Sequence, residues 1–323
     1  MASVLVTGGA GYIGSHTCKV LARSGYTPIV YDSLLRGNAW AVKWGPLEVG
    51  DLMDGERLRD VLRAHRPIGV IHFAAFAYVG ESMLHPLMYY RNNVGGTVSL
   101  LSAMAAEGVE RLVFSSTCAT YGAPNTNPIR EDMPQSPINP YGQSKLMVEN
   151  ILRDCTRDKS LSAVSLRYFN AAGADPDGEI GEAHDPETHL IPLALGAAKG
   201  DIPPLTIFGD DHPTADGTCV RDYIHVTDLA DAHVRALAYA GANDGFTALN
   251  LGTGIGASIM EVIHATYEVV GRQVPFSFGP RRAGDPPALV ADPSLARDVL
   301  GWSARNSDLR NILQTAWNWM ERR

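Results

Sequence analysis

A glycine-rich turn directly after the first predicted strand constrains the fold more than any other feature of the chain. The strand covers Ser3 to Thr7, and Gly8, Gly11 and Gly14 follow it at the start of a helix predicted over Ile13 to Arg23. Glycines in this pattern permit a tight turn and let backbone N–H groups at a helix start approach a pyrophosphate. Because the pattern lies between a strand and a helix, we interpret it as a dinucleotide-binding turn rather than an ordinary glycine-rich loop.

Alternating strands and helices continue through the first two thirds of the chain. The further predicted strands are Thr27 to Tyr31, Gly69 to Phe73, Arg111 to Ser115 and Leu161 to Arg167. An amphipathic stretch ends at Ala106, and another helix begins near Tyr141. Repeated strand–helix units build a parallel sheet with helices on both faces. The sequence therefore predicts an α/β fold with a doubly wound (Rossmann) parallel sheet.

Loops rich in Gly, Pro, Asp and His begin after Tyr168 and predict a smaller C-terminal α/β lobe. The elements expected there are a strand over Leu205 to Phe208 and helices over Ile191 to Ala198, Ser258 to Val270, Ser294 to Leu300 and Asp308 to Glu321. We expect residues 1–168, with 225–252 returning to them, to form the dinucleotide-binding domain. Residues 169–224 and 253–323 are expected to form the substrate-binding lobe.

Charge and cysteine content narrow the class of protein. A formal charge of −8 without a long basic run argues against a nucleic-acid or membrane partner. Four cysteines lie far apart without a CxxC pair, which favours reduced thiols over disulfides or a zinc site. No apolar stretch reaches spanning length, and the first strand begins too early for a signal peptide to precede it. We therefore expect a cytoplasmic protein.

The segment from His184 to His189 offers candidate metal ligands. Its spacing fits no pair on one helix face, Pro186 interrupts it, and no cysteine or third histidine is obviously placed beside it. The sequence therefore predicts no metal site.

Asp32 ends the second predicted strand at the distance expected for a ribose-binding acid. Its carboxylate can accept hydrogen bonds from both ribose hydroxyls, and its charge would repel a 2′-phosphate. This favours NAD over NADP, although Arg36 nearby could meet a 2′-phosphate. After the third strand, Asp51 and Leu52 are expected to border the adenine, with an ordinary Asp-containing turn as the alternative.

Tyr141 and Lys145 form a YxxxK pair, which a helix places on one face. A tyrosine is a poor base at neutral pH because its reference pKa is ~10, and a neighbouring ammonium lowers that pKa. Coupled to the glycine-rich turn, the pair predicts an acid–base centre rather than a surface pair. Thr117 lies in the run that directly follows the predicted apolar strand, and it is our choice for the hydroxyl that binds the reacting oxygen, with Ser116 as its competitor.

The chain resembles the extended short-chain dehydrogenase/reductases and, within them, the UDP-glucose (UDP-galactose) 4-epimerases. The resemblance spans nearly the whole sequence. Its matching stretches are Thr7 to His16, His72 to Ala75, Val79 to Ser82, Tyr89 to Val94, Ser115 to Gly122, Asn139 to Lys145, Leu166 to Asn170, Asp216 to Val226 and Arg281 to Asp285.

The resemblance implies that Tyr141 removes the proton of the sugar 4-hydroxyl while C4 passes a hydride to tightly held NAD. A 4-keto sugar would then turn over and take the hydride back on its other face. Lys145 would hold the nicotinamide ribose and tune Tyr141, while Thr117 would bridge to the sugar oxygen. A homodimer through the helices near Met83 to Glu107 and Tyr141 to Arg157 is also implied. The expected cofactor contacts are Gly8, Gly11, Tyr12, Ile13, Gly14, Asp32, Asp51, Leu52, Phe73, Ala74, Ala75, Asn92, Lys145 and Phe169.

A UDP-sugar needs its diphosphate neutralised, a task that suits arginine side chains. Arg221 and Arg282 match such a clamp; the alternative is that they form surface ion pairs with Asp216, Asp222 or Asp285. Besides Thr117 and Tyr141, the resemblance implies substrate contacts from Asn170, His189, Leu190, Thr206, Phe208, Asp285 and Leu289.

Three positions depart from the family pattern. Ala77 stands where many relatives have a lysine, His189 where they have an asparagine, and Leu289 where some have a tyrosine that limits sugar size. A smaller side chain at that last position leaves more room. UDP-N-acetylhexosamines and the pentose derivatives UDP-xylose and UDP-arabinose therefore stay open as substrates.

Two other functions share most of these features. A sugar-nucleotide 4,6-dehydratase needs an acid and a base after the threonine, where this chain has Cys118 and Ala119. A non-catalytic NAD-sensing protein would be expected to lose Tyr141 or Lys145, and both are present. The residues therefore favour a 4-epimerase.

Overall fold

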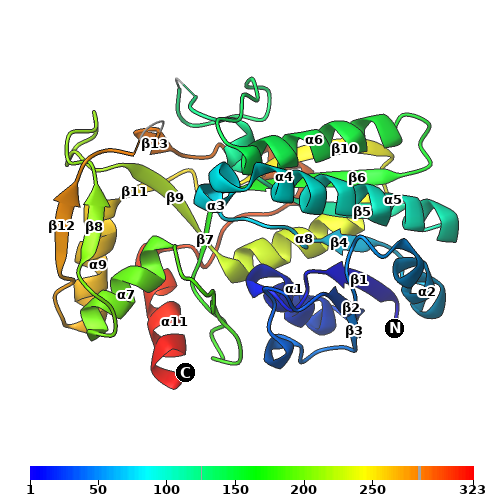
Figure 1. The fold of residues 1–323 in the computed structure, drawn as a ribbon, viewed down its shortest axis with the longest axis horizontal. Coiled ribbons are helices and arrows are strands. Elements are labelled where there is room, and N and C mark those ends of the chain that lie inside the picture. The colour runs from blue at the N-terminus through cyan, green and yellow to red at the C-terminus, as the bar shows by residue number, and fades with distance from the viewer. Residues whose placement is uncertain (125, 283–284) are drawn as a thin grey trace.

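The computed structural model describes residues 1–124, 126–282 and 285–323. Within these residues, the main sheet has seven parallel strands in the order β10-β6-β5-β4-β1-β2-β3 (Figure 1). They are β1 (Ser3–Thr7), β2 (Thr27–Asp32), β3 (Leu47–Val49), β4 (Val70–His72), β5 (Arg111–Thr117), β6 (Ser162–Tyr168) and β10 (Gly245–Leu251). The strand order reverses between β1 and β4, which is where ligands bind in sheets of this kind.

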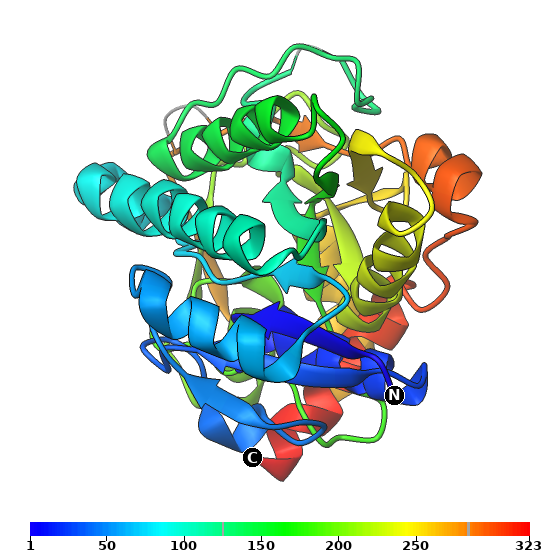
Figure 2. The ribbon, with the colours of Figure 1, turned by 90° about the vertical axis from the view of Figure 1, so that its right-hand side faces the viewer.

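Helices cover both faces of the main sheet, as the end-on view shows (Figure 2). One face carries α1 (Tyr12–Arg23), α8 (Val226–Ala240) and the short α10 (Ser294–Leu300). The other face carries α2 (Gly55–His65), α5 (Gly96–Glu107) and α6 (Pro140–Cys155). The predicted doubly wound α/β fold is therefore confirmed. Among the described residues, no helix is long and apolar enough to cross a membrane.

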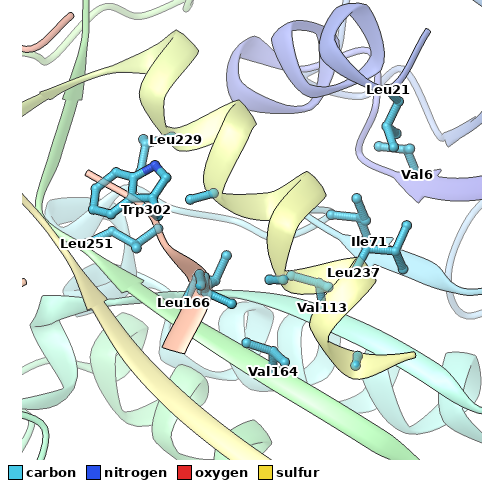
Figure 3. Packing of buried hydrophobic residues seen from close by; sticks show 14 of the residues in the cluster. Val6, Leu21, Ile71, Val113, Val164, Leu166, Leu229, Leu237, Leu251 and Trp302 are labelled. Atoms are coloured by element: carbon cyan, nitrogen blue, oxygen red, sulfur yellow. The ribbon is translucent and has the colours of Figure 1, made fainter. Parts of the chain in front are cut away.

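The larger hydrophobic core lies between α1, α8 and the sheet (Figure 3). Val6, Val113 and Val164 from three strands point into it, and none is more than 1% exposed. Trp302, which follows α10, lies in the same core and donates its Nε1–H to the carbonyl oxygen of Asp228 at 2.9 Å. Strands buried on both faces need continuous apolar runs, which explains why this part of the sequence reads as short β-branched segments.

A smaller group of strands and helices follows the C-terminal end of β6 (Figure 1). One small sheet holds β7, β9, β11 and β13, and β8 pairs with β12. The elements of this lobe are β7 (Asn170–Ala172), α7 (Leu190–Lys199), β8 (Leu205–Phe208), β9 (Val220–His225), β11 (Gly256–Ser258), α9 (Ile259–Val270), β12 (Phe276–Gly279), β13 (Ala288–Leu289) and α11 (Leu309–Arg322). The lobe therefore begins at the edge of the main sheet that is formed by the C-terminal ends of its parallel strands.

The predicted strand over Leu205 to Phe208 and the predicted helix over Ser294 to Leu300 are confirmed with the same bounds. The amphipathic stretch before Ala106 consists of a short helix and a longer helical run that contains a π-helical segment. The short helix is α3 (Val79–Leu84), and the longer run is made of α4 (Pro86–Tyr89), the π-helical segment η2 (Tyr90–Gly95) and α5. A proline cannot continue a helix that reaches it from the N-terminal side. Helix α3 therefore ends at Leu84, and α4 begins at Pro86.

Candidate active site

The glycine-rich turn lies where the loops after β1 and β4 meet. Gly8 has a φ of +72°, and a Cβ there would lie 2.6 Å from the backbone nitrogen of Ala74. A Cβ on Gly14 would collide with the carbonyl oxygen of Gly8. Any side chain at either position would force the two loops apart or push α1 away from β1. The glycines are therefore required by close packing at the point where the strand order reverses.

The start of α1 is suited to an anion. Gly11 is its N-cap residue, and within the described part of the chain no side chain caps this helix. The first turn also contains no acidic residue. Tyr12 begins the helix, and its hydroxyl donates to the carbonyl oxygen of Gly173 at 2.5 Å, while Ile13 packs against the main core. The first backbone N–H groups and the helix dipole thus remain available for a pyrophosphate.

Asp32 lies beside this turn at the end of β2. Its two carboxylate oxygens accept hydrogen bonds from the backbone nitrogens of Ala10 and Leu34, at 3.0 and 2.9 Å. Burial raises the pKa of Asp32, while these two bonds oppose that rise. Each oxygen keeps further acceptor capacity for a ribose hydroxyl.

Arg36 is engaged by Glu81 and Tyr78. Its guanidinium lies 2.6 Å from a carboxylate oxygen of Glu81 and 4.8 Å from the centre of the Tyr78 ring. The charge of Arg36 is thereby balanced by Glu81. The arrangement around Asp32 favours a free ribose, as in NAD, over a phosphorylated one.

Asp51 and Leu52 occupy the turn after β3. The Asp51 carboxylate accepts from the backbone nitrogen of Met53 at 2.8 Å, and its carbonyl oxygen accepts from the Tyr31 hydroxyl at 2.8 Å. Leu52 is only 6% exposed and packs in the core beneath α2 and α5. Both residues therefore have structural roles in the turn, and their contact with an adenine stays a prediction.

The loop after β4 forms the other side of the turn. The backbone nitrogens of Phe73 and Ala74 both donate to the carbonyl oxygen of Thr7, at 2.9 and 3.1 Å. Ala75 follows them on the same loop and is half-buried. Phe73, Ala74 and Ala75 are thus held against the glycine-rich turn, as the cofactor prediction requires of them.

Asn93 is a residue that the sequence analysis missed. It is 2% exposed, accepts from the backbone nitrogen of Phe76 at 2.8 Å and donates to the Ser144 hydroxyl at 3.0 Å. Asn92, the predicted cofactor residue, donates to the side-chain oxygen of Asn93 at 2.9 Å. Asn93 therefore joins the loop after β4 to α6, and its position beside Asn92 was the only available signal.

Helix α6 carries Tyr141 and Lys145 to the end of β5. Asn139 caps this helix by accepting from the backbone nitrogen of Gly142 at 2.8 Å, and Pro140 occupies its first turn. Tyr141 is 8% exposed and Lys145 is 3% exposed. The ammonium of Lys145 donates to the carbonyl oxygen of Ser115 at 2.8 Å and lies 6.0 Å from the centre of the Tyr141 ring. The predicted pair therefore lies on one buried helix face.

Burial sets the protonation of this pair in the unliganded chain. It raises the pKa of Tyr141 well above its usual range, and a hydrogen bond with the Thr117 side chain opposes that rise. Burial also lowers the pKa of Lys145 to about 7, against the opposing charge of Glu149. The site needs additional charge stabilisation before Tyr141 can act as a base at neutral pH, and a cationic ring bound beside it would supply this.

Thr117 and Ser116 point to different partners. Thr117 lies within hydrogen-bonding reach of the Tyr141 side chain. Ser116 is fully buried and donates to a carboxylate oxygen of Glu149 at 2.7 Å. Of the two hydroxyls proposed from the sequence, only that of Thr117 is beside the tyrosine.

A buried ion pair supports the catalytic helix one turn beyond Lys145. Glu149 and Arg167 are at most 1% exposed, and their closest oxygen and nitrogen atoms are 2.6 Å apart. Arg167 also donates to the Tyr121 hydroxyl at 2.7 Å. The pair links α6 to β6. It thereby fixes the position of α6, which carries Tyr141 and Lys145, on the main sheet.

Replacing Arg167 with methionine is expected to lower the free energy of unfolding by about 3–5 kcal/mol, because it leaves the Glu149 charge buried without its main partner. Arg153 is the matched control, since it reaches the same carboxylate at 3.5 Å from a position that is 39% exposed. Arg153→Met should change stability by about 0–1 kcal/mol. Urea denaturation measures both variants, and equal losses would contradict the assignment.

The arginines predicted to meet a diphosphate lie in the smaller lobe. Arg221 on β9 forms an ion pair with Asp285, so the alternative of an arginine–aspartate pair is realised, with both side chains largely buried. The Arg282 guanidinium stacks on the Phe208 ring, 4.1 Å from its centre. Asp222 instead accepts from the backbone nitrogens of the loop that begins at Thr253.

Arg221 of the smaller lobe also acts on Cys118, the residue directly after β5. Its positive charge acts on the Cys118 thiol, although burial dominates and raises the pKa of that thiol to about 12. Leu289 is paired with Arg221 in the small sheet and packs beside Phe169 in a cluster that also contains Cys118. Phe169, predicted to line the cofactor, is 7% exposed within this cluster.

The remaining predicted substrate residues surround the same lobe. Asn170 donates to the carbonyl oxygen of Asp222 at 3.2 Å, and Leu190 is the first residue of α7. Thr206 is exposed on β8, two residues before Phe208. His189 is the N-cap residue of α7, and its ring is hydrogen-bonded to Glu187 at 2.9 Å. His189 therefore points toward a carboxylate, an arrangement that its sequence position did not predict.

A dinucleotide turn beside a buried tyrosine and lysine is the arrangement of an enzyme that exchanges a hydride with a nicotinamide cofactor. Residues 4–252 match the model of the NAD dependent epimerase/dehydratase family. The chain belongs to this family.

Individual relatives match over almost the full length. A UDP-glucose 4-epimerase of Rhizobium meliloti (strain 1021) is 53% identical over 321 residues, which is 99% of this chain and 98% of that protein. The structure of a UDP-glucose 4-epimerase from Brucella ovis in complex with NAD has a TM-score of 0.96 at 54% identity and covers 98% of each chain. That of a Bifidobacterium longum UDP-glucose 4-epimerase in complex with NAD+ and UDP has a TM-score of 0.95 at 38% identity, covering 99% of this chain and 98% of that one.

Proposed function

We propose that the protein is an NAD-dependent 4-epimerase that interconverts UDP-glucose and UDP-galactose. The observation that carries the proposal is the buried group of Tyr141, Lys145 and Thr117 at the end of β5, two strands along the sheet from β1 and its glycine-rich turn. Relatives named UDP-glucose 4-epimerase that match over nearly the whole chain support the same activity.

The residues around the turn fit NAD. The uncrowded start of α1 suits the pyrophosphate, Asp32 suits the adenosine ribose, and Lys145 suits the nicotinamide ribose. When bound, NAD accepts a hydride from the sugar C4 and returns it. We propose the cofactor contacts named from the sequence, with the backbone of Phe73 and Ala74 closing the site around Gly8.

The chain's own groups move the proton. Tyr141 would take the proton of the sugar 4-hydroxyl and later give it back, and Thr117 would hold the same oxygen by a hydrogen bond. Lys145 would keep the phenolate of Tyr141 accessible by its positive charge. Because these groups are almost fully buried, water is largely excluded from the reacting atoms.

The substrate is held from the lobe. Arg221 and Arg282 would neutralise the diphosphate, so that the sugar can rotate about it and present either face to the cofactor. Asn170, His189, Leu190, Thr206, Phe208, Asp285 and Leu289 complete the proposed substrate contacts. Leu289 leaves room for N-acetylhexosamine or pentose derivatives as second substrates, whereas Cys118 offers no acid or base for a 4,6-dehydratase.

We also propose a homodimer. Exposed apolar side chains gather on the helices that the family resemblance places in a subunit contact, and a shared contact would cover them. They are Met83, Leu84, Leu87, Val98 and Met147, on α3, α4, α5 and α6. A reducing compartment, the cytoplasm, suits the four cysteines, all of which are described and free.

The domain division is likewise a proposal. Residues 1–168 and 225–252 supply all seven strands of the main sheet in the described chain, which supports their assignment to a dinucleotide-binding domain. Residues 169–224 and 253–323 supply the small sheets, α7, α9 and α11 of the substrate lobe. Helix α10 packs on the main core, so the boundary near residue 253 is not a clean break.

The test is to incubate the purified protein, without added cofactor, separately with UDP-galactose, UDP-GlcNAc and UDP-xylose, and to resolve the products by chromatography. We expect UDP-galactose to be converted to UDP-glucose. Conversion of UDP-GlcNAc would show that Leu289 admits the larger sugar. No epimer from any of the three, with NAD demonstrably bound, would overturn the proposal.

Thr117→Val should lower kcat by about 10²-fold, because it removes the hydroxyl beside Tyr141 without changing the side-chain shape. Ser116→Ala is the matched control. It removes a bond to Glu149, so it should cost about 1–3 kcal/mol of stability but leave kcat within a few-fold. Steady-state kinetics at saturating UDP-galactose compare the two, and a larger kcat loss in Ser116→Ala would reverse the assignment.

A further inference from the structure

Four side chains between β7 and the start of α7 meet in one small cluster, and only His189 among them has a place in the proposed epimerase reaction. Glu182, His184, Glu187 and His189 each supply one nitrogen or oxygen atom, and these atoms all lie within 4.8 Å of one another. The sequence predicts no metal here because the spacing fits no helix face. In the structure the segment has no helix until α7 and doubles back, so the rings of His184 and His189 lie 5.1 Å apart.

The distances are those of a nearly formed four-ligand site. His184 Nδ1 lies 3.0 Å from Glu182 Oε1 and 3.7 Å from Glu187 Oε2. His189 Nδ1 lies 2.8 Å from Glu182 Oε1 and 2.9 Å from Glu187 Oε1. Zinc bonds of about 2.0–2.2 Å in a tetrahedron place neighbouring ligand atoms roughly 3.3–3.6 Å apart. Shifts of a few tenths of an ångström would therefore accommodate an ion.

The charges also match. Two carboxylates, those of Glu182 and Glu187, meet two imidazole rings in this cluster. One divalent cation bound by two carboxylates and two neutral imidazoles forms a site without net charge. Two imidazole nitrogens and two carboxylate oxygens form a donor set that suits zinc and related transition metals.

The surroundings hold the cluster in place. The side chain of Glu182 is 8% exposed, and its carbonyl oxygen accepts from Trp319 Nε1 at 2.9 Å. Trp319 stacks on Trp40 with their ring centres 5.5 Å apart. Glu182 also lines a cavity of about 230 Å³ with Trp319. The cluster is thus supported from α11.

A second group of acidic residues already contains a cation of the protein at its centre. Asp175, Asp177 and Glu179 surround the ammonium of Lys19, which lies 2.7 Å from the first two carboxylates. That cation already balances the group, so it offers no place for a metal. In the cluster of Glu182, His184, Glu187 and His189, the carboxylates contact imidazole nitrogens instead of an ammonium.

We propose that Glu182, His184, Glu187 and His189 bind one divalent transition-metal ion of the zinc class. The bound ion fixes the segment before α7 against the start of α1, because the His184 ring packs edge-on to Tyr12 with ring centres 6.1 Å apart. The ion would bind His189 through Nδ1, which leaves Nε2 of the same ring for the proposed substrate contact.

The test uses the full-length protein, first dialysed against a chelator and then titrated with ZnCl₂ by calorimetry in a buffer that does not bind zinc. We expect one tight site per chain and a rise in Tm on zinc addition. The double substitution His184→Asn and His189→Asn should weaken the site by at least about 10–100-fold. Substituted Co²⁺ should give the visible absorption of a four-coordinate ion in the wild type only.

His264→Asn is the matched control, since His264 is an exposed histidine 3.4 Å from Glu268 and lies on α9. It should leave the tight site unchanged. Glu187→Gln removes one ligand with little change of shape and serves as a second variant should the double substitution fail to fold. Zinc binding that is equally tight in Glu187→Gln, in the folded double variant or in both would overturn the proposal, as would the absence of a stoichiometric site in the wild type.

Discussion

Tyr141→Phe is expected to lower kcat for UDP-galactose by about 10²–10⁴-fold, the range associated with losing a positioned acid–base group. The substitution removes the hydroxyl that bonds with Thr117 and keeps the ring that packs at 8% exposure on α6. The protein should therefore stay folded, and NAD should stay bound. Steady-state kinetics and the cofactor content of the purified variant measure the two effects separately.

Tyr267→Phe is the control for this prediction because Tyr267 is 42% exposed on α9. It should change neither kcat nor cofactor content. Wild-type turnover in Tyr141→Phe would contradict the role given to this hydroxyl. A loss of turnover that is matched by loss of bound NAD would show that Tyr141 acts mainly in binding.

Lys145→Ala is expected to lose both rate and cofactor affinity. The ammonium is 3% exposed, bonds the Ser115 carbonyl oxygen at 2.8 Å and is the positive charge on the same helix face as Tyr141. Its removal would leave the Tyr141 phenolate without a counter-charge and the nicotinamide ribose without a donor. We expect kcat to fall by about 10²-fold or more. NAD should dissociate during purification or gel filtration.

Lys159→Ala serves as the matched control, since the Lys159 side chain is 72% exposed at the far end of the loop after α6. It should behave as the wild type in both assays. If Lys145→Ala kept its cofactor and lost only rate, the lysine would tune Tyr141 without holding the ribose. Unchanged rate would remove Lys145 from the mechanism.

Much of the fold could be predicted because its signals are local. The strand Ser3–Thr7 and the glycines after it lie within fifteen residues. Each glycine stands where another part of the backbone comes close, and the motif predicts this close approach. The start of α6 follows from Asn139 and Pro140, an N-cap and a first-turn proline. The Tyr141 and Lys145 pair could therefore be placed on one face before any coordinates were known.

Contacts between distant segments could not be predicted in the same way. The arrangement of Glu149 with Arg167 depends on how α6 lies over β6, which no spacing in the sequence specifies. The role of Ser116 depends on this pair. Its hydroxyl donates to Glu149 and does not point to the side of the strand where the reacting oxygen would bind. The sequence favoured Thr117 over Ser116, but the contact that engages Ser116 elsewhere could not be predicted from it.

The segment from Glu182 to His189 illustrates the same limit. Spacing rules for metal ligands assume that a helix or a tight turn brings the side chains together. Here an irregular segment doubles back, and the supporting contact comes from Trp319, which is 137 residues away in sequence. Leu52 is a second case, since a residue expected beside the adenine packs its side chain into the core.

The most direct test of the proposed reaction uses UDP-galactose that carries deuterium at C4, incubated with the purified protein without added cofactor. Hydride transfer out and back at one site predicts UDP-glucose that retains the deuterium at C4, with no label lost to water. UDP-glucose that contains solvent hydrogen at C4 would contradict the account, because the hydrogen would then have left the enzyme's site between the two half-reactions.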